Sequence, residues 1–140
     1  MMEGSAGPFI IGVLIVAAMI FVAMLVTKKR QYRFNVEVYQ AKFLKIENGL
    51  NKQNAATFMK TVIDSDKLLD KAMMEMGIPG KNMGDRLKHS KDKFTDINAV
   101  WRAHKLRNAL AHEDDLEITY RQAVNALSIY KQALKDLGAI

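Results

Sequence analysis

An unbroken apolar run near the N-terminus limits what this chain can fold into more than any other feature. The run from Phe9 to Val26 holds no charged or strongly polar side chain, and the uncharged window extends from Gly4 to Thr27. The hydrocarbon core of a bilayer is about 30 Å thick and needs roughly 20 apolar helical residues. A helix satisfies its own backbone hydrogen bonds, as lipid requires. Because the run is both this long and without a polar stripe, it predicts one transmembrane helix rather than a buried core helix.

The charges that flank the run predict its orientation. A cleaved signal peptide has a positive segment before its apolar stretch and a small-residue cleavage site after it. Here only Glu3 and the amino terminus precede the run, and Lys28, Lys29, Arg30 and Arg33 follow it. The positive-inside rule then places the N-terminus outside and the C-terminal part in the cytoplasm. We therefore expect an uncleaved, single-pass protein of the cell (plasma) membrane, with the lipid bilayer as its first partner.

The remainder of the chain is basic. It carries all 21 Lys and Arg and lacks only Glu3 of the acids, which leaves it at about +7. Such a charge attracts anionic headgroups, holds nucleic acid or simply keeps a domain soluble. The chain has no cysteine, so it has no disulfide and no thiolate metal site, in keeping with a reducing cytoplasm.

Beyond the anchor the sequence predicts an all-α fold. Apolar residues recur at steps of three and four rather than alternating, which indicates helices and favours an antiparallel bundle of four to five helices. We divide the chain into a tail, transmembrane helix and basic collar (1–30), a connecting amphipathic helix (31–53) and a cytoplasmic helical bundle (54–140).

Several helix ends can be predicted from capping residues. The helix that begins near Asn54 should stop at Gly77, and Asn82 should cap a short helix. Thr95 or Asp96 should cap the next one, which runs to about residue 111. We expect the last helix to start at the polar break of residues 112–115, because acids in a first turn suit the helix dipole.

One short motif suggests chemistry. Residues 107–112 read Arg-Asn-Ala-Leu-Ala-His, where an inner helix gives way to the last one. This segment resembles the Arg-Asn-x-x-x-His motif of the higher-eukaryote-and-prokaryote nucleotide-binding (HEPN) family, whose helical bundle is of similar size. The resemblance covers roughly residues 35–140, and its specific part is six residues long.

The resemblance implies metal-independent RNA cleavage at a site where two protomers bring their motifs together. His112 would exchange protons with the ribose 2′-hydroxyl and the leaving oxygen, and Arg107 would hold the phosphate. Asn108 would orient one of them. On one straight helix, however, Arg107 and His112 lie about 140° apart around the axis. They converge only if the helix ends before His112 or if the site forms across a dimer.

A structural interpretation of the same residues is open as well. Arg107 and His112 suit a helix C-terminus, and Asn108 can close backbone groups, so the three could form a latch between helices. The resemblance allows this too, because family members have commonly lost catalysis and kept the fold as a binding module. We favour a membrane-tethered interaction or scaffold module over a tethered ribonuclease. Its partners would be a second copy of the chain, RNA or a cytoplasmic protein.

The sequence predicts no cofactor and no metal. His104, Asn108 and His112 share one row of a helix, but the two histidines would lie about 12 Å apart along its axis, too far for one ion. The glycines at 77, 80 and 84 surround a helix turn and do not follow a strand, so no phosphate-binding loop is expected.

Overall fold

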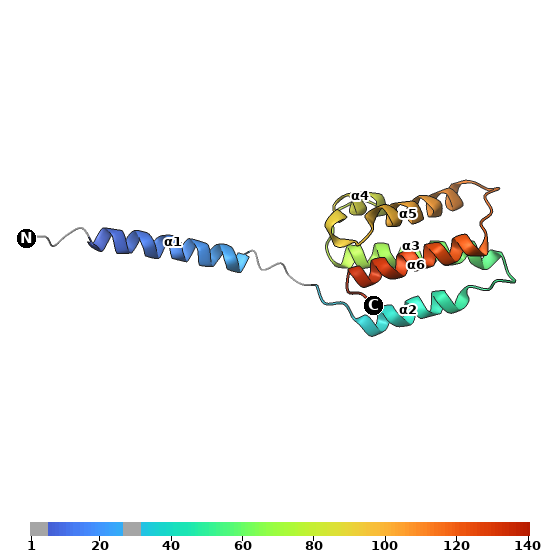
Figure 1. Ribbon diagram of the computed structural model, residues 1–140, viewed down its shortest axis with the longest axis horizontal. Helices are drawn as coiled ribbons and strands as arrows, with labels where there is room; N and C mark the ends of the chain where they lie inside the picture. The colour runs from blue at the N-terminus through green and yellow to red at the C-terminus, as the bar shows by residue number, and fades with distance from the viewer. Residues whose placement is uncertain (1–5, 27–31) are drawn as a thin grey trace, which may run out of the picture. The chain divides into compact units, whose positions relative to one another are not determined.

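The computed structural model describes residues 6–26 and 32–140, which belong to two separate compact units (Figure 1). In the first unit, α1 (Ala6–Val26) is a single apolar helix. Its segment Gly7–Met24 has a mean hydropathy of 2.6 and is long and apolar enough to cross a membrane. Of the four basic residues expected to set its orientation, Arg33 is exposed. Lys28, Lys29 and Arg30 lie outside the described residues.

The second unit, Tyr32–Ile140, is a helical bundle. Over its whole length the structure describes helices and turns and no strand, which confirms the all-α prediction. Helix α3 is central, since it packs against each of the other α-helices of the unit, and α5 also packs against α6 (Figure 1). The elements in order are α2 (Val36–Gly49), α3 (Ala56–Glu75), α4 (Met83–Lys88), the short 3-10 helix η1 (Lys91–Lys93), α5 (Ile97–His112) and α6 (Tyr120–Asp136).

Helix α2 packs as part of this bundle. Its aromatic side chains Tyr39 and Phe43 are buried in the common core, and it packs along α3. Asn35 caps its start by accepting a hydrogen bond from the backbone N–H of Val38 at 3.3 Å. The segment 31–53, which the sequence assigned to a connecting helix, therefore contributes core residues to the second unit.

The predicted ends of the middle helices are confirmed. After α3, Gly77 has φ +74, its N–H bonds the carbonyl of Met74, and the N–H of Ile78 bonds that of Met73. This is a Schellman ending, which requires the left-handed backbone that glycine adopts without strain. The side chains of Asn82 and Asp96 accept hydrogen bonds at the starts of α4 and α5.

The expected start of the last helix was wrong. Helix α5 continues through His112, residues 113–119 are not helical, and α6 begins at Tyr120. The reason is a capping box: Thr119 accepts from the backbone of Gln122, whose side chain accepts from the backbone of Thr119 in return. This reciprocal pair satisfies two free N–H groups of the helix, which the acids at 113–115 do not do.

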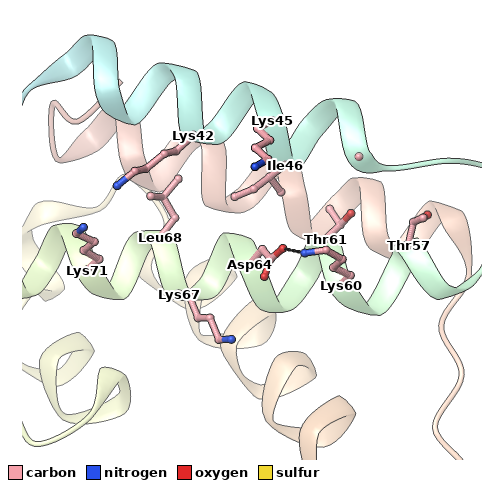
Figure 2. A pocket seen from close by; sticks show the side chains of 11 residues that line it. Lys42, Lys45, Ile46, Thr57, Lys60, Thr61, Asp64, Lys67, Leu68 and Lys71 are labelled. Atoms are coloured by element: carbon pink, nitrogen blue, oxygen red, sulfur yellow. Dashed lines mark hydrogen bonds and ion pairs between the residues drawn. The ribbon is translucent and has the colours of Figure 1, made fainter.

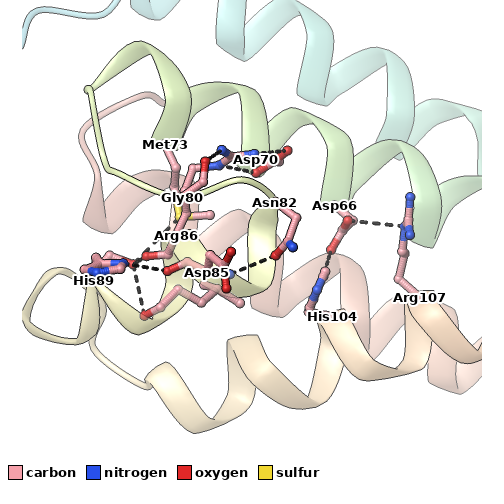
Figure 3. Close-up of polar contacts among 12 residues, drawn as sticks. Asp66, Asp70, Met73, Gly80, Asn82, Asp85, Arg86, His89, His104 and Arg107 are labelled. Atoms are coloured by element: carbon pink, nitrogen blue, oxygen red, sulfur yellow. Dashed lines mark hydrogen bonds and ion pairs between the residues drawn. The ribbon is translucent and has the colours of Figure 1, made fainter.

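A polar contact between side chains also holds α4 against α3. The buried Arg86 guanidinium binds Asp70 through two hydrogen bonds, Nε to Oδ1 at 2.7 Å and Nη2 to Oδ2 at 2.9 Å (Figure 3). Its Nη1 also donates to the carbonyl oxygen of Gly80 at 2.7 Å. This fork holds the turn after α3 against the short helix and closes one end of the bundle.

Candidate functional site

The motif residues Arg107 and Asn108 belong to a polar cluster inside the bundle. The centre of the cluster is the carboxylate of Asp66, on α3, which is only 3% exposed. We call it the Asp66 cluster, and it is made of side chains from three helices: Asp66 of α3, His104, Arg107 and Asn108 of α5, and Tyr130 of α6.

One oxygen of Asp66 receives two hydrogen bonds. His104 is buried beside it, with Nδ1 2.8 Å from Oδ1, and the hydroxyl of Tyr130 donates to the same oxygen at 2.9 Å. Burial, followed by the nearby negative charge of Asp66, raises the pKa of Tyr130 far above its usual value. Tyr130 therefore stays protonated and acts as a donor.

The other oxygen of Asp66 faces Arg107. The Arg107 Nε lies 3.4 Å from Oδ2, close enough for an ion pair, but this buried Nε makes no hydrogen bond within the described residues. The guanidinium instead donates through Nη1 to Asn108 Oδ1 at 3.0 Å. Asn108 Nδ2 in turn lies 3.2 Å from His104 Nε2.

These contacts form a closed ring, and they determine which ring nitrogen of His104 donates and which one accepts. Because Asn108 uses its oxygen to accept from Arg107, its amide nitrogen donates to His104 Nε2. In this arrangement Nδ1 carries a proton and donates it to Oδ1 of Asp66. The single positive charge of Arg107 balances the single negative charge of Asp66. The cluster is thus a nearly satisfied polar network that joins three helices.

The open side of the cluster forms one wall of a cleft of about 730 Å³. Arg107, Asn108 and His104 line it together with Trp101, whose ring meets the His104 ring edge-on at 6.1 Å between centroids. Figure 3 shows Arg107 and His104 on either side of Asp66. Four lysines also line the cleft: Lys67, Lys81, Lys88 and Lys105. Two arginines and three aspartates line it as well, so six basic groups face three acidic ones and the cleft is basic on balance.

His112 stands apart from the other two motif residues. It is the last residue of α5, is exposed, does not line the cleft, and makes no side-chain hydrogen bond or ion pair in the part of the chain that the structure describes. Since α5 is continuous from Arg107 to His112, the two side chains point about 140° apart. The first condition for convergence, a helix that ends before His112, is not met, and assembly across two copies is the remaining route.

No family model matches this chain. The comparisons with curated proteins and with solved structures likewise gave no match.

Asp66 and Tyr130 were not among the site residues predicted from the sequence, and His104 was considered only as a metal ligand. Asp66 falls on the apolar stripe of α3 between Val62 and Leu69, and an acid on such a stripe signals a buried partner. Tyr130 lies on the apolar stripe of α6 in the same way. His104, rejected as a metal ligand, binds Asp66 across 38 residues of sequence. The spacing of residues within one helix does not predict a pairing between two helices.

Proposed function

We propose that this chain is a single-pass membrane protein in which α1 holds a basic, HEPN-like helical domain at the cytoplasmic face of the cell membrane. The domain acts there as an interaction or scaffold module. The apolar length of α1 and the basic residues that follow it support the anchor and its orientation. The position of the motif at the end of α5, the last helix before the terminal one, supports the resemblance to the HEPN family.

We favour a module over an enzyme because Arg107 and Asn108 already bind other side chains of the bundle. The charge of Arg107 is already balanced by the buried carboxylate of Asp66, and one of its N–H groups is bonded to Asn108, so the guanidinium is held against α3. Asn108 is committed to His104. His112 points elsewhere and has no group that orients it in the described structure. These residues therefore favour a latch between helices.

The anchor and its orientation are tested with the full chain in cell membranes. We expect the protein to resist alkaline carbonate extraction, and the helical domain to be digested by protease only after the cytoplasmic face is opened. Replacing Lys28, Lys29, Arg30 and Arg33 together by Glu should mix the two orientations. A matched control replaces four domain lysines, Lys52, Lys81, Lys88 and Lys91, by Glu and should leave the orientation unchanged. Loss of the protein on carbonate extraction would contradict the anchor.

A membrane-tethered, metal-independent endoribonuclease is the second candidate, and the basic cleft beside Arg107 favours it. The test is cleavage of single-stranded RNA by the full chain in neutral detergent with a chelator present. The module predicts no cleavage at any protein concentration. Cleavage that both Arg107→Ala and His112→Ala remove, with helical content unchanged, would establish the enzyme instead.

Mixing those two variants tests where such a site would form. If a catalytic site takes Arg107 from one copy and His112 from another, the inactive variants regain part of the activity when they are combined. If both groups act within one copy, the mixture stays inactive.

A further inference from the structure

A second hollow lies between α2 and α3, on a different face of α3 from the Asp66 cluster. It has a volume of about 520 Å³. Figure 2 shows Lys42 and Lys71 at one end of it and Thr57 at the other, so it follows the seam between the two helices. We call it the lysine groove, after the five lysines that line it: Lys42, Lys45, Lys60, Lys67 and Lys71.

The positive charge of the lysine groove is mostly uncompensated. Its one lining acid, Asp64, pairs with Lys60 on the same helix, and Lys71 pairs with Glu75, one turn along, at 3.8 Å. Lys45 and Lys67 have no acidic partner within the described ranges 6–26 and 32–140. At the end of the groove, the neighbouring Lys71 lowers the pKa of Lys42, and the charge of Glu75 only partly offsets this effect. A bound anion would offset it further.

The floor and the open end of the groove are apolar. Ile46 and Leu68 line it between the lysine stems. One turn beyond Lys42 and Lys71, the same helix rows continue with Val38, which is 43% exposed, and Met74, which is 56% exposed. Exposed aliphatic side chains next to ammonium groups match the boundary between acyl chains and headgroups, where lysine stems lie along apolar surface and their charges reach outward.

Chain connectivity brings a bilayer within reach of this end. Helix α2 begins about ten residues after α1 ends, and a fully extended stretch of that length spans at most about 36 Å. Lys42 is in the second turn of α2. A bilayer that holds α1 is therefore close enough to meet the Lys42 end of the groove. Nucleic acid is a poorer match, because no aromatic ring lines the groove for bases to stack on.

We propose that the lysine groove binds the phosphate headgroups of anionic lipids at the surface of the bilayer that α1 crosses. Lys42 and Lys71 contact the phosphates, and Val38 and Met74 enter the apolar boundary beneath them. This inference rests on the proposed membrane anchor. It names the lipid class that the domain meets there and gives the basic charge of α2 and α3 a specific partner.

The test uses the full chain in neutral detergent micelles and measures how fast each lysine is acetylated, by mass spectrometry. The micelles are doped either with phosphatidylglycerol or with phosphatidylcholine. We expect phosphatidylglycerol to slow acetylation of Lys42, Lys45 and Lys71 about fivefold. Lys88 of α4 and Lys91 of η1 serve as internal references, because neither lines the groove, and Figure 1 shows α4 on the other side of α3 from α2. Their rates should not change.

Two pairs of variants sharpen this result. Lys42→Gln with Lys71→Gln should remove the protection of Lys45, whereas the matched pair Lys88→Gln with Lys91→Gln should keep it. Circular dichroism checks that both remain folded. Equal rates in the two lipids, or equal protection of the reference lysines, would overturn the proposal. Equal protection by inorganic phosphate or by a glutamate-rich peptide would overturn it as well, since the groove would then be a general anion site or a protein-docking site.

A separate arm distinguishes the groove from the anchor. Full-length protein is mixed with liposomes, and its association is measured by flotation after carbonate treatment. Failure to float contradicts the anchor, and the micelle measurement still decides whether the groove selects anionic lipid. Flotation without selective protection in micelles retains the anchor and rejects the groove.

Discussion

His104 of α5 and Asp66 of α3 are joined by a buried 2.8 Å hydrogen bond that fixes the imidazole with its proton on Nδ1. The other ring nitrogen accepts from Asn108, so the histidine has no free nitrogen and no role left except to join the two helices. This pairing gives the Arg-Asn segment a structural purpose. Asn108 orients His104, and Arg107 neutralises the carboxylate that His104 binds.

The carboxylate of Asp66 should be the most sensitive group in the cluster. Asp66→Asn removes the charge that balances Arg107 and turns an acceptor into a donor facing Tyr130 or His104. We expect the free energy of unfolding to fall by about 3 kcal/mol, because one partner of a buried ion pair is left uncompensated. Urea unfolding of the full chain in neutral detergent, followed by circular dichroism, measures this change.

The matched control for that substitution is Asp64→Asn, two residues away on the same helix. Asp64 is partly exposed and pairs only with Lys60, one turn before it. We expect an effect within about 0.5 kcal/mol. Equal losses for the two variants would mean that the cluster is not specifically stabilising.

The fork between Arg86 and Asp70 should not tolerate lysine. Arg86→Lys keeps the charge but cannot form two parallel bonds to Asp70 while also reaching the carbonyl of Gly80. We expect a loss of about 2 kcal/mol in the same unfolding measurement. Arg102→Lys is the control, because Arg102 is exposed and lies 3.9 Å from Asp96. A neutral result for Arg86→Lys would show that charge alone holds α4 in place.

Asp136 should make stability depend on pH. Its partial burial opposes ionisation, but hydrogen bonds from the backbone of Thr95, from Gln132 and from the Thr95 hydroxyl outweigh it and lower the pKa of Asp136. The carboxylate therefore stabilises the fold above the unfolded-state pKa of about 4, and this contribution is lost as pH falls through the lower folded-state pKa.

The corresponding variant is Asp136→Asn, which should cost about 1 kcal/mol at pH 7. The difference from the wild type should shrink as the pH is lowered toward 2. Asp92→Asn, at an exposed position, should differ from the wild type at neither pH. If the stability difference between Asp136→Asn and the wild type grew as the pH was lowered, the pKa of Asp136 would be raised by folding instead of lowered.

Helix ends that depend on residues within one turn could be predicted from the sequence. Contacts between residues far apart in the chain could not. The glycine at 77 and the caps at Asn82 and Asp96 act within one turn of their helices, so they could be recognised in advance. The start of α6 was misplaced because three acids suggested a first turn. The Thr119 and Gln122 pair was equally visible and is the stronger signal.

The grouping of the Asp66 cluster could not be predicted from the sequence, because tertiary contacts bring its members together. Asp66, His104 and Tyr130 come from three helices, and 64 residues separate Asp66 from Tyr130. Asp66 and Tyr130 lie among apolar residues of their own helices, and only packing shows that Tyr130 and His104 bind the Asp66 carboxylate. The motif drew attention to the right segment of α5. It did not show that Arg107 and Asn108 face inward while His112 lies at the exposed end.

The most direct test of this account compares Arg107→Gln with His112→Gln in urea unfolding of the full chain. If the Arg-Asn part of the motif latches the helices and His112 takes no part, Arg107→Gln should lower the free energy of unfolding by about 2–3 kcal/mol. His112→Gln should then stay within about 0.5 kcal/mol of the wild type. Equal stability of the two variants, or a larger loss for His112→Gln, would contradict the latch.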